Sequence, residues 1–384
     1  MSGSTSRRAF LGTGLALLAG LGGAAACAGT ARQRAAPLPA PVATDDFLVY
    51  QDLPYAAPVG RGHLLDIYLP PAADGPVPVV IHHLGSAFRS DDTKGDALPP
   101  PPSTTQQAAP AAEPTPAPAS VPLPFDPASL SGMIGPRGVA SWLVPRGYAV
   151  VGLNVRSSSQ VKFPGQVHDV KAAIRYLRAN ANACGLDPDR FVTMGNSSGG
   201  WVATMAALTA GAEELEGDLG NGSQSSAVKA VVDLYGPTDF LAMDAHRLPH
   251  GDRHDGADSP ESELMGFAIQ TDPEAVRKAN PAAYVRAGSP PAFIAHGMAD
   301  PLVPFNQSEI LFDAYERARV SANLTLIPGV GHTDGYLSDP GHSPGRTVRR
   351  TRNGSTTTGT EPAPTFETLV AFLDTHLGRL PSPP

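Results

Sequence analysis

The chain has 384 residues, with 28 lysines and arginines against 36 aspartates and glutamates, which gives a formal net charge of -8 at pH 7. This acidic balance argues against nucleic acid or an anionic membrane surface as the main partner. More than 300 residues follow the N-terminal segment, which is enough to bury a large core and predicts one large α/β domain.

The first 26 residues have the pattern of an export signal that is removed from the mature protein. Arg7 and Arg8 precede an apolar stretch that ends in three small residues, Ala24, Ala25 and Ala26. The stretch is too short and too rich in glycine for a permanent membrane helix, which needs about 20 apolar residues. The paired arginines predict the twin-arginine route. We therefore expect an exported protein that is extracellular, periplasmic or lipid-anchored at the cell surface.

Cys27 directly follows these alanines, where a bacterial lipoprotein signal places the cysteine that receives lipid. Two interpretations stay open, a lipid on Cys27 that attaches the protein to a membrane, or an incidental cysteine in a protein without an anchor. Once the signal is removed and Cys27 is set aside, Cys184 remains as a free thiol, so an intramolecular disulfide scaffold is excluded. Residues 27–44 are rich in Ala and Pro and predict a tether before a domain at 45–380.

Within this domain, short apolar runs alternate with segments of helical period. The runs that suit strands buried on both faces are VPVVIH (77–82), YAVVGLNV (148–155), RFVTM (190–194), AVVDLYG (230–236), AFIAHG (292–297) and NLTLIPG (323–329). Helical spacing follows at 167–177, 200–210 and 306–319. This alternation predicts an α/β fold with a mostly parallel central sheet and helices on both faces. Two earlier runs, FLVYQDL and HLLDIYLP, predict an antiparallel start.

Three segments interrupt this alternation and are predicted to be insertions around one domain. Residues 97–127 hold eleven prolines among Ala, Ser, Thr and Gln, a composition that cannot pack a core. The segment from His246 to Pro260 is polar and rich in turn residues, and the segment from about Tyr336 to Pro364 is rich in Gly, Thr and Arg.

The run FVTMGNSSGGW contains the pattern Gly-x-Ser-x-Gly, formed by Gly195, Ser197 and Gly199. It follows a predicted strand and precedes a predicted helix, which is the context that gives this motif its value. Flanking glycines let the backbone turn sharply, so Ser197 is predicted to be a nucleophile held at the strand end. Ser198 lacks these flanks, and its backbone N–H is predicted to face a developing oxyanion.

A serine nucleophile needs a base and a group that orients the base, and two later segments supply them. Asp300 follows the AFIAHG strand, and His332 follows the last predicted strand on a glycine-flanked loop. The chain order Ser197, Asp300, His332 is the one expected of an α/β-hydrolase. The alternatives that remain are His296 as the base and Asp233 or Asp239 as the acid.

The chain resembles the α/β-hydrolase esterases grouped with bacterial bifunctional xylan/ferulate esterases (BD-FAE-like) and with the lipase-like relatives of prolyl oligopeptidase. The similar blocks include KFPGQVHDVKAAIRYLRANANACGLDPDRFVTMGNSSGGW, SPESELMGFAIQTDPEAV, SPPAFIAHGMADPLVPFNQSEIL and the closing VGH. They cover most of residues 60–333. The resemblance implies an α/β-hydrolase fold in which Ser197 is the nucleophile, Asp300 orients the imidazole, and His332 is the base and then the acid.

The resemblance also implies an oxyanion hole in the loop HHLGSAF, with the backbone N–H of Ser86 as one donor and that of Ser198 as the other. Leu84 occupies the usual histidine position of this loop, which puts the hydrogen bonds that shape the loop in question. No cofactor is required, and the expected partner is a small-molecule or polysaccharide-linked ester. His246, His250 and His254 recur at intervals of four, but Pro249 and Gly251 disfavour the helix that a metal site would need.

The predicted function is carboxylic ester hydrolysis through an acyl-enzyme intermediate. Two alternatives are kept, a serine peptidase or amidase of the prolyl-oligopeptidase-like type and a surface lipoprotein that retains the fold without catalysis.

Overall fold

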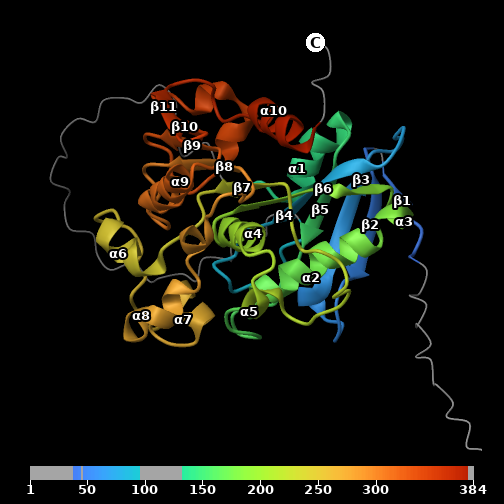
Figure 1. Ribbon diagram of the computed structural model, residues 1–384, viewed down its shortest axis with the longest axis horizontal. Helices are drawn as coiled ribbons and strands as arrows, with labels where there is room; N and C mark the ends of the chain where they lie inside the picture. The colour runs from blue at the N-terminus through green and yellow to red at the C-terminus, as the bar shows by residue number, and fades with distance from the viewer. Residues whose placement is uncertain (1–37, 45, 96–131, 379–384) are drawn as a thin grey trace, which may run out of the picture. The chain divides into compact units, whose positions relative to one another are not determined.

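The computed structural model describes residues 38–44, 46–95 and 132–378, and the elements below belong to the compact unit Pro39–Pro384 (Figure 1). The predicted signal at 1–26, Cys27 and the Pro-rich insertion at 97–127 lie outside the described residues.

The described strands form one sheet. In chain order they are β1 (Val42–Ala43), β2 (Leu48–Pro54), β3 (Leu64–Leu69), β4 (Val77–His83), β5 (Ala149–Leu153), β6 (Leu186–Asn196), β7 (Ala230–Leu234), β8 (Ala292–Gly297), β9 (Ala322–Ile327), β10 (Thr347–Arg352) and β11 (Ser355–Gly359).

The longer described helices are α1 (Pro136–Leu143), α2 (Gly165–Ala179), α4 (Ser198–Leu208), α9 (Asn306–Ala318) and α10 (Phe366–Leu377). Helices of four to six residues are α3 (Ala181–Cys184), α5 (Glu213–Glu216), α6 (Met243–His246), α7 (Pro260–Met265) and α8 (Pro273–Arg277). Short 3-10 turns are η1 (Arg61–His63), η3 (Val144–Arg146), η4 (Phe240–Ala242), η5 (Ile269–Thr271), η6 (Pro281–Tyr284), η7 (Gly335–Ser338) and η8 (Pro340–His342).

The strand order across the sheet is β1-β2-β3-β5-β4-β6-β7-β8-β9-β10-β11. The six strands from β5 to β9 in this order are parallel to one another. The pairs β1–β2, β2–β3 and β3–β5 are antiparallel, as the sequence predicted for β2 and β3. Parallel strands end at one edge of the sheet, so the loops after β4, β6, β8 and β9 meet there. This edge carries the candidate site.

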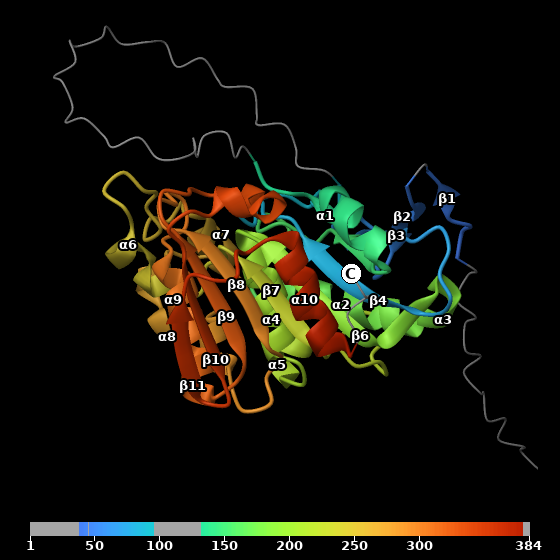
Figure 2. The same cartoon turned by 90° about the horizontal axis from the view of Figure 1, so that it is seen from above.

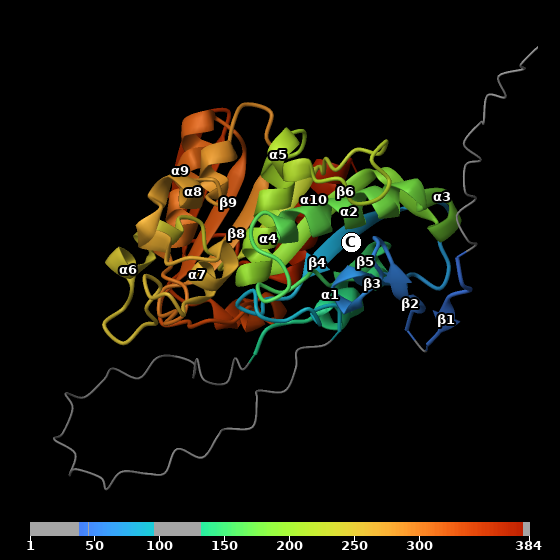
Figure 3. The ribbon, with the colours of Figure 1, turned by 90° about the horizontal axis from the view of Figure 1, so that it is seen from below.

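Helices cover both faces of the sheet, which confirms the predicted fold class. Helices α1 and α10 pack on one face, where their apolar side chains join the core with η7 (Figure 2). Helices α2, α4 and α9 lie on the other face (Figure 3). Every residue of α4 is buried, so this helix, which begins directly after Ser197, is held on all sides.

Two sequence-based expectations are corrected by the sheet. The end of the predicted tether at 27–44 is part of the domain, because Val42 and Ala43 form β1 and pair with Val49 and Leu48 of β2. The segment from Tyr336 to Pro364, predicted to be an insertion around the domain, contains the hairpin β10–β11, which extends the sheet beyond β9. Alternation of apolar and polar residues is weak in this hairpin, since Thr and Arg dominate it, so the strand pattern was not visible.

Candidate functional site

Ser197 lies in the sharp turn between β6 and α4. Its backbone has φ 54° and ψ -132°, a conformation that costs a residue with a β-carbon on the order of 1–3 kcal/mol. The turn is held by backbone bonds, since Ser197 N donates to Leu234 O at 2.9 Å and Gly200 N donates to Ser197 O at 2.9 Å. The predicted strand, turn and helix around the Gly-x-Ser-x-Gly motif are therefore present.

The two flanking glycines are required by close backbone approach. A β-carbon on Gly195 would lie 2.1 Å from Gly199 O, and a β-carbon on Gly199 would lie 2.0 Å from His83 O on β4. Neither glycine has a positive φ, because Ser197 itself takes that conformation. The motif therefore allows the turn to pack tightly against β4 rather than supplying unusual dihedral angles.

Asp300 and His332 meet at the same edge of the sheet. His332 Nδ1 lies 2.7 Å from Asp300 Oδ2, while Asp300 Oδ1 accepts hydrogen bonds from Leu302 N at 2.8 Å and Val303 N at 3.0 Å. Burial by itself raises the pKa of Asp300, but hydrogen bonds from His296 and His332 outweigh it and bring the pKa below its ordinary value. The resulting carboxylate holds the proton of His332 on Nδ1 and leaves Nε2 as the basic nitrogen.

Ser197 and His332 line one cavity, although no hydrogen bond joins these two side chains in this structure. In free enzymes such a bond is often long and tightens only when substrate is bound. The three residues predicted from the sequence are thus brought to one place from the ends of β6, β8 and β9.

His296, the alternative base, is fully buried inside the sheet edge. Its Nδ1 lies 2.7 Å from Ser308 Oγ, and its Nε2 lies 3.0 Å from Val303 O and 3.3 Å from Asp300 Oδ2. It is not among the residues that line the cavity with Ser197. His296 therefore contacts Asp300 on the side away from the cavity and does not reach Ser197.

The two alternative acids do not contact His332. Asp233 is fully buried at β7, accepts a hydrogen bond from Gly236 N at 3.0 Å, and has its pKa raised to about 7 by burial. The side chain of Asp239 accepts from Leu241 N and caps η4. Both carboxylates serve the local backbone, so Asp300 is the acid that the geometry selects.

The predicted role of Ser86 does not hold in this structure. Ser86 N donates to Ser198 Oγ at 2.8 Å, so this N–H is already used. The next residue, Ala87, lines the cavity, and its N–H has no acceptor among the described residues. Ala87 and Phe88 have φ of 51° and 62°, which turns the loop toward the cavity. The backbone N–H groups of Ala87 and Ser198 are therefore the better pair for an oxyanion.

Comparison with known proteins finds esterases that share this fold. The BD-FAE family model matches residues 133–315, and the solved structure of a truncated carbohydrate esterase from gut microbiota superposes with a TM-score of 0.64. That esterase is 28% identical, and the alignment covers 89% of this chain and 100% of that one. The chain is thus similar in sequence and fold to α/β-hydrolase esterases of the BD-FAE type.

Other proteins similar to this chain carry related names. Esterase LipQ of Mycobacterium tuberculosis is 28% identical over 285 residues, which cover 73% of this chain and 56% of LipQ. A bifunctional GH43-CE protein of Bacteroides eggerthii is 31% identical with a TM-score of 0.60, over 74% of this chain and 35% of that protein. The chain spans about half the length of the curated relatives it matches.

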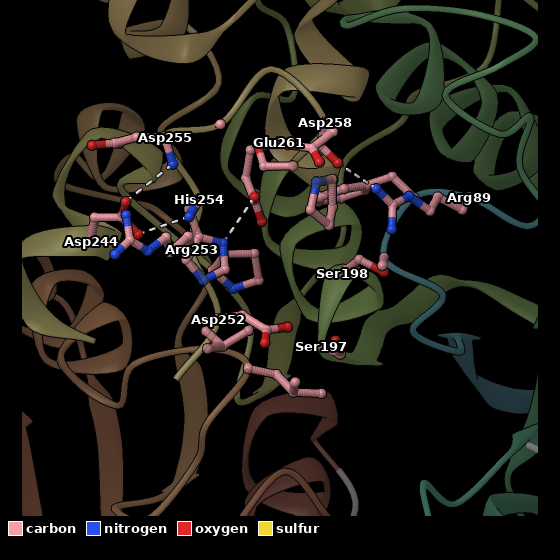
Figure 4. A pocket seen from close by; sticks show the side chains of 18 of the residues that line it. Arg89, Ser197, Ser198, Asp244, Asp252, Arg253, His254, Asp255, Asp258 and Glu261 are labelled. Carbon is pink, nitrogen blue, oxygen red and sulfur yellow. Dashed lines mark hydrogen bonds and ion pairs between the residues drawn. The ribbon is translucent and has the colours of Figure 1, made fainter. Parts of the chain in front are cut away.

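The cavity beside Ser197 has a volume of about 590 Å³, and several charged side chains line it (Figure 4). One wall comes from the segment that the sequence marked as a polar insertion, His246 to Pro260, and from Glu261 at the start of α7. Its charged lining residues are Asp244, Asp252, Asp255, Asp258 and Glu261 against Arg89 and Arg253. The protein therefore offers hydrogen-bonding groups along this wall.

Within that wall, His254 and Glu261 form a buried pair. His254 Nδ1 lies 2.9 Å from Glu261 Oε2, and His254 Nε2 has no hydrogen-bond partner in the described residues. The backbone N of His254 is fixed by Asp244 Oδ1 at 2.7 Å. Burial opposes protonation of His254, but Glu261 reverses this effect and raises the pKa of the imidazole.

The histidine repeat in this segment does not form a metal site in the described residues. His246 ends α6, His250 is exposed, and His254 pairs with Glu261, so the interval of four does not bring them together. Across residues 38–44, 46–95 and 132–378, no group of three His, Cys, Asp or Glu side chains is placed to hold a metal. In the same part of the chain, no helix is long and apolar enough to cross a membrane.

Sequence analysis missed the N–H of Ala87, the pair of His254 with Glu261, and a buried pair formed by Asn196 and Asp334. Asn196 Nδ2 donates to Asp334 Oδ2 at 2.8 Å. The only sequence signal for the last pair was position, since Asn196 precedes the nucleophile and Asp334 lies two residues after His332. Neither position predicts a contact, because the loops that carry them are far apart along the chain.

Proposed function

We propose that this protein is a serine hydrolase that cleaves carboxylic esters through an acyl-enzyme intermediate. The observation that carries the proposal is the hydrogen bond from His332 to the Asp300 carboxylate at the cavity that Ser197 also lines. Relatives that are named esterases support the ester rather than the amide.

In the proposed reaction, Ser197 Oγ attacks the ester carbonyl while His332 Nε2 takes the hydroxyl proton. The backbone N–H groups of Ala87 and Ser198 stabilise the negative charge on the carbonyl oxygen by hydrogen bonds. His332 then gives its proton to the leaving alcohol as the carbon–oxygen bond breaks. Water activated by His332 attacks the acyl-enzyme, which releases the acid and returns the proton to Ser197. Asp300 stays ionised throughout and stabilises the imidazolium.

The test is hydrolysis of 4-nitrophenyl esters of increasing chain length by the wild-type protein and by Ser197→Ala, with a 4-nitroanilide as the amide control. The proposal expects ester turnover that is lost in Ser197→Ala and slow or absent anilide cleavage. Fast anilide cleavage would favour the peptidase alternative. A folded wild-type protein that cleaves no ester and does not react with a fluorophosphonate probe would favour the non-catalytic alternative.

For the substrate, we propose an ester whose alcohol part is rich in hydroxyl groups. The wall from Asp252 to Glu261 combines acceptors and donors, and its residues Asp252, Arg253 and Asp255 are exposed, so this wall leads from Ser197 to the surface. A large alcohol that extends into solvent fits that direction. The names of two related structures, a carbohydrate esterase and a GH43-CE protein, support the same class.

We further propose that the protein is exported by the twin-arginine route and that Cys27 carries a lipid. The support is the sequence alone, with Arg7 and Arg8 before an apolar stretch. Lysines in place of both arginines should retain the precursor in the cytoplasm. If the lipid is present, Cys27→Ser should move the exported protein from the membrane fraction to the soluble fraction, whereas an unchanged distribution would reject the lipid.

A further inference from the structure

Asn196, the last residue of β6, joins the nucleophile turn to two other loops. Its side chain is fully buried. Asn196 Oδ1 accepts a hydrogen bond from Gly85 N at 2.8 Å, in the loop that carries Ala87. Its Nδ2 donates to Asp334 Oδ2 at 2.8 Å and to Ile134 O at 3.3 Å. The amide therefore uses both of its ends in contacts with distant parts of the chain.

Asp334 completes this arrangement from the loop that carries His332. It is fully buried, and its second oxygen, Oδ1, accepts from Ile134 N at 2.8 Å. No lysine or arginine of the described residues forms an ion pair with it. Burying a carboxylate without a cation is costly, so the presence of Asp334 here calls for an explanation beyond stability.

We propose that Asn196 and Asp334 are positioning residues that hold the oxyanion loop and the His332 loop in register with Ser197. The inference rests on the proposed ester hydrolysis. Gly85 lies two residues before Ala87, Asn196 lies one residue before Ser197, and Asp334 lies two residues after His332. Fixing these three points fixes the distances between the groups that must act together on one carbonyl carbon. Neither side chain lines the cavity itself.

The chemistry of the pair permits an exchange experiment. In Asn196→Asp, two carboxylates face each other, and one must take up a proton or move away. In Asp334→Asn, the amide has one oxygen that can accept hydrogen bonds, but two donors, Asn196 Nδ2 and Ile134 N, face it. The double variant Asn196→Asp/Asp334→Asn reverses the roles, because the new amide donates to the new carboxylate, which still accepts from Gly85 N. The longer contact with Ile134 O is lost, and a carboxylate oxygen then faces this carbonyl oxygen.

The test measures kcat and KM for 4-nitrophenyl acetate in the wild type, both single variants and the double variant, together with the free energy of unfolding. Each single variant should lower kcat by about tenfold or more, the order expected when an oxyanion donor is displaced, with KM within about threefold. The double variant should recover most of kcat. Asn280→Ala, which removes a side-chain cap on η6 away from the cavity, should leave kcat unchanged.

Two outcomes overturn the proposal. Single variants that are folded and have wild-type kcat would make the pair a structural feature only. A double variant that recovers the free energy of unfolding but not kcat would show that the pair stabilises the fold without positioning the reacting groups. Failure of the proposed function is distinct, because the wild type would then cleave no ester at all.

Discussion

Replacing Asp300 with asparagine tests the assignment of the acid. In the structure the carboxylate is surrounded by donors: Leu302 N and Val303 N at one oxygen, and His332 Nδ1 and His296 Nε2 at the other. An amide can offer its oxygen to one side only. With the backbone donors kept, its NH2 group faces His332, whose proton must then move from Nδ1 to Nε2.

That tautomer removes the lone pair that accepts the proton of Ser197. Loss of the correct tautomer lowers kcat by about 10⁴-fold in serine hydrolases with this arrangement, a change of roughly 5 kcal/mol in the activation free energy. We expect a loss of this order in Asp300→Asn, with KM changed by less than about threefold because substrate contacts are intact. The assay is kcat and KM for 4-nitrophenyl acetate at pH 7.

The matched control is Asp233→Asn, since Asp233 is also a buried carboxylate near the carboxyl edge of the sheet and was an alternative acid. Its amide keeps an oxygen for Gly236 N, so kcat should stay within about threefold of the wild-type value. The assignment would be refuted if Asp233→Asn lost activity as strongly as Asp300→Asn, or if Asp300→Asn kept more than about a tenth of kcat.

Three further predictions follow from packing, charge and the cavity wall. In Gly199→Ala the new methyl group would lie 2.0 Å from a main-chain oxygen of β4, so the free energy of unfolding should fall by about 3 kcal/mol. In the control Gly222→Ala the methyl group has no atom within 4 Å, so this variant should match the wild type in urea denaturation. Burial raises the pKa of Asp233 from 3.8 to about 7, so the folded state keeps this proton to higher pH than the unfolded state. The free energy of unfolding should therefore fall between about pH 4 and pH 7 relative to Asp233→Asn, by on the order of 4 kcal/mol; a difference that is constant with pH would contradict this. We compare kcat/KM for an acetylated methyl glycoside with kcat/KM for 4-nitrophenyl acetate, and His254→Gln should lower the ratio of the first to the second by about tenfold. The exposed control His250→Gln should keep the wild-type ratio. Equal ratios in both variants would show that His254 does not recognise the alcohol.

The parts that could be predicted from the sequence share a physical origin. Strands buried on both faces must be continuously apolar, so runs such as VPVVIH and AFIAHG mark β4 and β8 within a residue of their ends. Ser197, Asp300 and His332 were found because each follows such a strand, and parallel strands bring their following loops to one edge. The hairpin β10–β11 was not predicted, because threonine and arginine side chains dominate it and apolar residues do not alternate along it.

The fold class, the turn at Ser197 and the chain order of the three candidate catalytic residues could be predicted from the sequence, because they depend on local pattern and on the topology that local pattern implies. Tertiary structure alone decided which N–H groups are free for an oxyanion. Ser86 and Ala87 are neighbours in one loop, and only the contact of Ser86 N with Ser198 Oγ, 112 residues away, tells them apart. The pair of Asn196 and Asp334, separated by 138 residues, was decided in the same way. A hydrogen bond between side chains from distant loops leaves no periodicity in the chain, since its geometry is set by how the loops pack and not by the residues between them.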